Sequence, residues 1–259
     1  PPVTRRARDL GAEGRATLAF FEAYFSNFIE GTKFSVDKAV EIVFHGVIPQ
    51  SRPADAHDVV GTWRVVADPH EMARTPTNPQ MLLDLLRSRH ATLMAARPDK
   101  HPGAFKVEDN MAGSTAFVAH ELVEGTLVHG FELYRGLDTP FARAVYMMFL
   151  VSEVHPFTDG NGRTARIMMN AELVSAGEAR IIIPTVFREN YWSALRALSL
   201  GEHSPRQLVR VLDFAQRWVA AVPWGEMSAT TAALTQCHAF LESAEAEERG
   251  VKLRMPEGF

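Results

Sequence analysis

The chain has 259 residues, of which 46% are hydrophobic, so it can bury the core of one large domain or of one domain with an appendage. Its formal net charge of −4 argues against a nucleic-acid partner, because proteins that bind nucleic acid present a basic face. With Cys237 as its single cysteine, it can form neither an internal disulfide nor a cysteine metal site, and we expect a reducing, cytoplasmic environment. No apolar run approaches the ~18 residues of a membrane-spanning helix, so we expect no membrane partner. Because the chain begins with PPVTRR rather than methionine, we also expect flanking segments.

The spacing of apolar residues, together with helix-end signals, predicts a mainly helical chain. In chain order, helices are expected at about residues 15–30, 36–45, 59–66, 79–97, 120–136, 140–154, 163–176, 189–200, 205–221 and 229–249. Gly31 and Gly46 are expected to end the first two helices, and Ser35 to cap the start of the second. Thr139, followed by a proline, is the expected N-cap of the 140–154 helix. That helix is apolar nearly all round and should lie in the middle of the fold.

Two segments depart from the helical pattern. Residues 104–118 place the turn formers Asp109-Asn110 and Gly113-Ser114 between short β-compatible runs, which predicts a hairpin or exposed flap. Residues 180–187, RIIIPTVF, are typical of a short strand. The expected fold class is therefore all-α with a small β-hairpin flap.

The densest polar cluster, HPFTDGNGRTAR at residues 155–166, directly follows the apolar helix. Gly160 and Gly162 permit a tight loop whose backbone N–H groups form an anion nest, and the next helix adds its positive N-terminal end. Arg163 and Arg166 are three residues apart on that helix and therefore share one face. Two forked guanidinium groups above such a nest suit a polyphosphate.

Three further residues of the cluster extend this chemistry. Asp159 adjoins the nest, where a carboxylate beside phosphates is a usual ligand of Mg²⁺. His155 is placed to take a proton from an attacking hydroxyl, and Phe157 can anchor the loop in the core. Each part alone is more often structural: a single histidine, a glycine turn or a solvated arginine pair. Their occurrence together within twelve residues favours a phosphate site.

Other candidate ligand patterns are weak. HELVE, from His120, begins like the zinc motif H-E-x-x-H but has Glu124 where the second histidine is needed. The remaining histidines without ligand spacing are expected at the surface or in loops; they are His45, His57, His70, His90 and His101.

HPFTDGNGRTAR matches every fixed position of the pattern H-x-F-x-[D/E]-G-N-G-R-x-x-R, so the chain resembles the Fic-domain proteins of the Fic/Doc family. The resemblance covers roughly residues 16–222 and implies the mainly α-helical Fic fold. It also implies transfer of AMP from ATP to a Ser, Thr or Tyr hydroxyl of a target protein. On this reading the chain has an N-terminal extension (1–15), an inhibitory helix with the helix after it (16–50), a Fic core (51–222) and a C-terminal helical appendage (223–259).

The resemblance also implies roles for individual residues. His155 would deprotonate the target hydroxyl, and Asp159 would bind Mg²⁺. Asn161 and the backbone of Gly160 to Gly162 would hold the α- and β-phosphates. Arg163 would help to hold the phosphates, and Arg166 would hold the γ-phosphate. The nucleotide-binding set is Phe157, Gly160, Asn161, Gly162, Arg163, Arg166 and Tyr191.

Two of these assignments extend beyond the motif. Tyr191 would line the adenine pocket, although a helix-packing aromatic explains it equally well. The flap would align an extended target segment by strand-like pairing. The flap residues assigned to that docking are Lys106, Val107, Thr115 and Phe117.

SNFIEG, from Ser26 to Gly31, resembles the inhibitory motif [S/T]-x-x-x-E-[G/N] of many Fic proteins, in the class whose inhibitory helix precedes the Fic core. The resemblance implies that Glu30 pairs with Arg166 and keeps the γ-phosphate of ATP from being held properly. The alternative is a glutamate on a solvated helix end.

Several functions stay open beside AMP transfer. The Fic motif distinguishes phosphates better than bases, so transfer of UMP or phosphocholine is an alternative, as is removal of AMP. Phosphorylation by the Doc branch fits less well, because that branch has lysine where this chain has Gly162. An alternative of another class is a silent Fic-fold binding or regulatory module. Fic proteins often form dimers, so a homodimer is possible.

Overall fold

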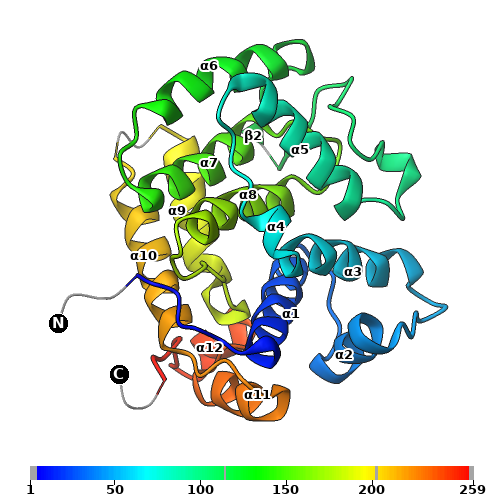
Figure 1. Ribbon diagram of the computed structural model, residues 1–259, viewed down its shortest axis with the longest axis vertical. Coiled ribbons are helices and arrows are strands. Elements are labelled where there is room, and N and C mark those ends of the chain that lie inside the picture. Colours follow the sequence, from blue (N-terminus) through cyan, green and yellow to red (C-terminus); the bar gives the residue numbers. More distant parts are fainter. Residues whose placement is uncertain (1–4, 114, 202–203, 257–259) are drawn as a thin grey trace. The chain divides into compact units, whose positions relative to one another are not determined.

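The computed structural model describes residues 5–113, 115–201 and 204–256, and the chain is mainly helical (Figure 1). Within the described residues the sheet structure is a two-stranded antiparallel hairpin, β1 (Met111–Ala112) and β2 (Thr115–Ala116). Met111 pairs with Ala116, and Ala112 with Thr115. The all-α class and the hairpin flap are thereby confirmed, while the expected turn residue Ser114 lies outside the described residues.

The chain divides into two compact units, one formed by Pro1–Gly31 with Gly177–Phe259 and the other by Thr32–Ala176. The helices of the second unit are α2 (Val36–His45), α3 (Pro53–Ala67), α4 (Pro69–Met72), α5 (Pro79–Leu93), α6 (Val123–Arg135), α7 (Pro140–Val154) and α8 (Asn161–Ser175). The 3₁₀ turns of this unit are Pro98–Lys100 and His120–Leu122. Helices α7 and α8 run alongside each other through most of their length, and α5 and α6 pack around them.

The expected helix ends of this unit are confirmed. Ser35 caps α2 by accepting a hydrogen bond from the N–H of Lys38, and Gly46 ends it in the left-handed conformation. Thr139 caps α7, and most side chains of α7 are buried, as its apolar composition predicts.

The helices of the first unit are α1 (Ala12–Phe28), α9 (Arg188–Ser199), α10 (Arg206–Ala221), α11 (Met227–Gln236) and α12 (Ser243–Glu248), with a 3₁₀ turn at Thr185–Phe187. The aromatic face of α1 packs on the C-terminal segment of the chain. Phe21 contacts Trp224 and Phe240, and Phe25 stacks on Phe240 with ring centroids 5.4 Å apart. None of the helices in the described part of the chain is long and apolar enough to cross a membrane.

Three secondary-structure predictions are wrong. Residues 180–187 form no strand: Ile181, Ile182 and Ile183 are buried individually in an irregular segment that leads into the 3₁₀ turn. The helix expected at 229–249 is two helices, because His238 adopts φ 63° and turns the chain between α11 and α12. Helix α3 begins at Pro53, whereas the segment before residue 59 was expected to be a loop.

Candidate active site

His155 lies at the C-terminal end of α7, in a backbone conformation that is unusual for a residue with a side chain. Its φ is 49°, and its N–H still donates to the carbonyl of Val151 at 3.0 Å. Its ring Nδ1 lies 3.2 Å from the carbonyl oxygen of Ser152. A carbonyl can only accept, so Nδ1 carries the proton, and in the neutral ring the lone pair is on Nε2. The imidazole is therefore oriented as a base.

The loop between α7 and α8 is closed by a reciprocal pair of hydrogen bonds. The N–H of Phe157 donates to Oδ1 of Asn161 at 2.8 Å, and Nδ2 of Asn161 donates back to the carbonyl of Phe157 at 2.8 Å. Both side chains are buried. Helix α8 begins at Asn161, two residues before the expected start, so its positive N-terminal end opens directly at this loop.

Gly160 is required where α8 begins. It has φ 73°, and a Cβ there would lie 2.9 Å from Sδ of Met94. Gly162 follows in the first turn of α8. The structure thus brings the two glycines of the motif to the N-terminal end of α8, and the anion nest there stays a prediction.

Asp159 presents its carboxylate at the entrance to the glycine loop. Its side chain is 45% exposed, and Oδ1 accepts a hydrogen bond from the N–H of Gly160 at 2.6 Å. Among the described residues, no group of three or more His, Cys, Asp or Glu side chains could hold a metal ion. A half-exposed single carboxylate fits Mg²⁺, which keeps several waters and takes further oxygens from bound phosphates.

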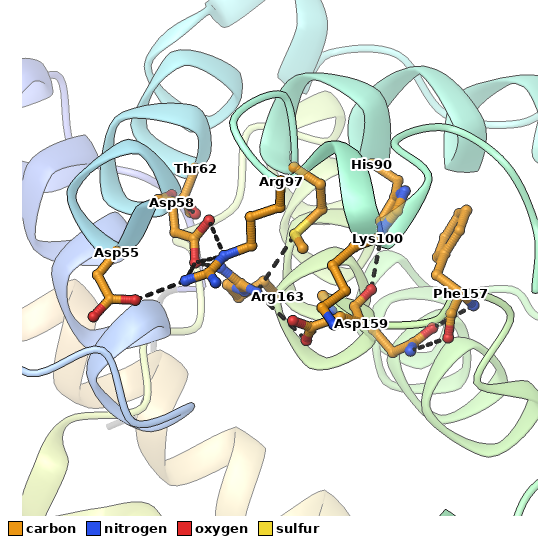
Figure 2. Close-up of polar contacts among 12 residues, drawn as sticks. Asp55, Asp58, Thr62, His90, Arg97, Lys100, Phe157, Asp159 and Arg163 are labelled. Atoms are coloured by element: carbon orange, nitrogen blue, oxygen red, sulfur yellow. Dashed lines mark hydrogen bonds and ion pairs between the residues drawn. The ribbon is translucent and has the colours of Figure 1, made fainter. Parts of the chain in front are cut away.

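Arg163 lies in a buried network of ions that the sequence did not predict (Figure 2). Its Nη1 is 3.0 Å from Oδ2 of Asp58 on α3, and its Nη2 is 3.7 Å from Oδ1 of Asp159. Asp58, whose side chain is 2% exposed, also accepts from Arg97, which binds Asp55 at 2.7 Å. The guanidinium of Arg163 thus joins α8 to α3, and its expected part in holding the phosphates stays a prediction.

Arg166 lies one turn further along α8 and is 5% exposed. Glu30 belongs to the other compact unit, in an exposed turn that follows α1. Gly31 beside it has φ 97°, which favours glycine, and Ser26 is buried on α1. The pairing of Glu30 with Arg166 stays a prediction.

The flap residues do not all face a prospective target. Val107 is 73% exposed, and Thr115 lies half-buried in β2, so their assignment to docking an extended segment stays a prediction. Lys106 is buried, and its Nζ binds Asn110 and the carbonyl of Val154. Phe117 stacks on the ring of His155, with centroids 3.7 Å apart. Lys106 and Phe117 thus contact the loop that carries His155, and their part in docking a target stays a prediction.

His90 was expected at the surface or in a loop, and that expectation is wrong. It is fully buried on α5 and stacks on Phe157 with ring centroids 3.7 Å apart. Its Nδ1 accepts from the N–H of Gly103 at 2.9 Å, so Nε2 donates to the carbonyl of Asp159 at 3.0 Å (Figure 2). Burial lowers the pKa of His90 to about 4, which keeps the ring neutral and holds Asp159 in place.

The sequence did contain a signal for His90. Leu82, Leu86 and Leu93 are its neighbours on the face of α5 that is apolar at helical spacing, and all three are buried. Asp58 was not recognised, because the helix around it was expected to begin only at residue 59. Tyr191, assigned to the adenine pocket, is 2% exposed on α9 of the other unit, and this burial favours the alternative of helix packing.

Comparison with known proteins agrees with this geometry. The family model described as Fic/DOC family matches residues 80–173, which run from α5 to α8. The chain is 26% identical to Protein adenylyltransferase fic-1 of Caenorhabditis briggsae over 191 residues, 72% of this chain and 38% of that protein. It is 34% identical over 99 residues to a Fido domain-containing protein of Dictyostelium discoideum, covering 36% of this chain and 69% of that one. The structure resembles Fic-1 of C. elegans with a TM-score of 0.65 and 24% identity, over 84% of this chain and 63% of that chain.

The fold and the loop from His155 to Arg166 define a Fic core, and the chain belongs to the Fic/DOC family. It spans well under half of the length of the curated C. briggsae relative. The activity of the whole protein is therefore argued from the site itself.

Proposed function

We propose that the chain is a protein adenylyltransferase that transfers AMP from ATP to a hydroxyl side chain of a target protein. The observation that carries the proposal is the complete motif loop, with an oriented His155 base, a half-exposed Asp159 carboxylate and a glycine nest at the start of α8. The adenylyltransferase names of the relatives support the same chemistry.

The reaction is an in-line displacement at the α-phosphorus of ATP. Nε2 of His155 takes the proton of the target hydroxyl, the hydroxyl oxygen bonds to phosphorus, and the bond to the pyrophosphate oxygen breaks. The N–H groups at the start of α8 stabilise the charge on the phosphate oxygens. Asp159 would hold Mg²⁺, which neutralises charge on the phosphates when it is bound.

Autoinhibition by Glu30 is part of the proposal. A carboxylate paired with Arg166 competes with the γ-phosphate for the same guanidinium, so ATP would bind with its α-phosphate misaligned. We expect Glu30→Gly to raise incorporation of AMP into the protein and into its targets by an order of magnitude or more. Equal labelling of wild type and Glu30→Gly by radiolabelled ATP would refute autoinhibition by Glu30.

Nucleotide choice needs a separate measurement, because a phosphate nest accepts any base. Labelling by Glu30→Gly should be displaced by unlabelled ATP and not by UTP or CDP-choline at the same concentration. Displacement by UTP or CDP-choline would favour transfer of UMP or phosphocholine.

Two other functions have their own tests. Removal of AMP requires Glu30 to position a water molecule, so a labelled target should lose AMP with wild type and keep it with Glu30→Ala. Mass spectrometry of lysate treated with Glu30→Gly tests the silent binding module, which would transfer AMP to no protein. If AMP is transferred, the same measurement identifies the targets. The intact His155, Asp159 and Arg166 argue against the silent module.

A further inference from the structure

The base of the flap supplies hydrogen bonds to four successive carbonyls of the catalytic loop. Nζ of Lys106 donates to Val154 at 3.4 Å, and the N–H of Lys106 donates to Pro156 at 2.8 Å. The side-chain amide of Asn110 donates to His155 at 3.4 Å and to Phe157 at 2.9 Å. Each of the four carbonyls from Val154 to Phe157 therefore accepts a hydrogen bond from either Lys106 or Asn110.

The side-chain bond from Lys106 to Val154 is buried, and the bonds from Asn110 are partly buried, so together they constrain the loop. Lys106 is 5% exposed, and its Nζ also donates to Oδ1 of Asn110 at 2.6 Å, which fixes the direction of the amide group. Burial lowers the pKa of Lys106, consistent with an ammonium that has exchanged water for these acceptors.

The other end of the flap contacts the catalytic ring itself. Phe117, directly after β2, stacks on His155 with a centroid distance of 3.7 Å and an interplanar angle of 6°. Its N–H donates to the carbonyl of Asn110 at 3.3 Å, so both arms of the hairpin are joined below the strands. The flap thus fixes the backbone of His155 from one arm and the plane of its ring from the other.

His155 needs such support, because the left-handed conformation at the end of a helix is usually taken by glycine, whereas His155 carries a side chain. A non-glycine residue with φ 49° is held by its surroundings, and the Nδ1 contact to Ser152 depends on that backbone. A base that must meet a hydroxyl within hydrogen-bond distance loses rate steeply when it is misplaced.

We propose that Asn110 and Phe117 are positioning residues that make the flap and the His155 base one rigid body, so that a target segment docked on the flap is already in register with the base. This inference rests on the proposed AMP transfer. Asn110 and Phe117 would act on the reaction only through His155. Docking of the target would then involve the remaining flap residues, among them the exposed Val107 and the half-buried Thr115.

The test compares Asn110→Asp, Phe117→Leu and Phe117→Tyr in the Glu30→Gly protein. Asn110→Asp keeps the shape and the acceptor for Lys106 but loses the amide donors; Phe117→Leu loses the flat ring, and Phe117→Tyr keeps it. The matched control is Met111→Ala, a 65% exposed flap side chain. The readouts are kcat and KM for ATP in AMP transfer, and the tautomer of His155 in ¹⁵N-histidine NMR spectra, assigned with His155→Ala.

We expect Asn110→Asp and Phe117→Leu to lower kcat by roughly tenfold or more, with KM for ATP changed by less than about threefold. The Nδ1-protonated tautomer of His155 should lose population in both. Phe117→Tyr should retain the wild-type tautomer and rate, and Met111→Ala should leave the tautomer unchanged.

An unchanged tautomer and an unchanged kcat in both Asn110→Asp and Phe117→Leu would overturn the inference. If Asn110→Asp does not fold, Phe117→Leu still tests the inference, because the ring that it replaces is only half-buried. Failure of the proposed function looks different: Glu30→Gly would then transfer no AMP, while the NMR spectra would still decide whether the flap orients His155.

Discussion

At the scale of single residues, Arg163 has contacts that its place in the motif did not predict. The sequence placed Arg163 and Arg166 on one helix face above a phosphate. In the structure Arg163 is held by Asp58 and lies beside Asp159, and Met94 Sδ is 3.5 Å from its Nη2. Arg163 therefore also links the start of α8 to α3.

Asp58→Asn should destabilise the protein, because it removes the buried charge that Arg97 and Arg163 share. Breaking a buried pair from one side leaves the partner uncompensated and costs on the order of 3 kcal/mol. The matched control is Asp55→Asn, where the carboxylate is 29% exposed and a loss of about 1 kcal/mol or less is expected. Urea unfolding at neutral pH measures both. Equal losses in the two variants would contradict the structural role of Asp58.

The burial of His90 predicts that the free energy of unfolding depends on pH. Its pKa is lowered from 6.5 to about 4 in the folded protein, mainly by burial. The stabilisation is complete above pH 6.5 and is lost as the pH falls toward 4, amounting to on the order of 3 kcal/mol. His90→Asn keeps an acceptor for Gly103 and cannot titrate. The free-energy gap between wild type and His90→Asn in urea unfolding should be largest at pH 7.5 and narrow at pH 5, and a constant gap would exclude the effect.

Residue-level contacts were the hardest to predict. The linear motif identified His155, Asp159 and the glycines because their roles follow from neighbours in sequence. Asp58 contacts Arg163 of α8 and Asn110 contacts the loop before α8, each from 45 or more residues away, and only the folded chain brings them there. His90 could have been recognised from its place on the buried face of α5.

At the scale of elements, caps and periodicity predicted most helices, and the failures occurred where tertiary packing decided the local structure. The residues 181–183 have strong β propensity, but they find no neighbouring strand and pack singly into the core. The break at His238 lets Phe240 reach Phe21 and Phe25 on α1. Neither the packing of residues 181–183 nor the contacts of Phe240 can be predicted from a short window of sequence.

Helices α6, α7 and α8 are joined by a buried carboxylate, Glu172 on α8. The hydroxyl of Tyr134 lies 2.9 and 3.0 Å from its two oxygens, and Nε of Arg143 lies 3.7 Å from Oε2. Burial raises the pKa of Glu172 to about 7, although Tyr134 and Arg143 both favour the charged form.

The raised pKa of Glu172 has a defined consequence for stability. The protonated carboxyl stabilises the fold fully below pH 4.5, and this contribution is lost as the pH rises through 7, on the order of 3 kcal/mol in total. Glu172→Gln cannot ionise at this position. Its free energy of unfolding in urea, relative to that of the wild type, should therefore rise between pH 4.5 and pH 8. A difference between the two proteins that is independent of pH would contradict the assignment.

At the scale of the whole molecule, the proposed control draws one residue from each compact unit, Glu30 from the first and Arg166 from the second. The catalytic loop, the flap and the buried ions that support it all belong to the second unit. The proposed chemistry therefore uses residues of the second unit, and its proposed regulation adds Glu30 of the first.

Competition between Glu30 and ATP for Arg166 predicts different thermal responses to the nucleotide. A ligand at 100 times its Kd stabilises a protein by about 2.7 kcal/mol, so a tighter complex gives a larger rise in Tm at fixed ATP. Glu30→Gly should show a larger rise than wild type with Mg-ATP. In the Arg166→Ala background, Glu30→Gly should have no further effect on the rise. Equal rises in wild type and Glu30→Gly would speak against the competition.

The most direct measurement follows the label of ATP onto protein. Glu30→Gly is incubated with ATP labelled at the α- or at the γ-phosphate, beside Glu30→Gly/His155→Ala. AMP transfer predicts that the α-label enters protein, that the γ-label leaves as pyrophosphate, and that the double variant incorporates neither. Incorporation of the γ-label, or of α-label without His155, would contradict the account.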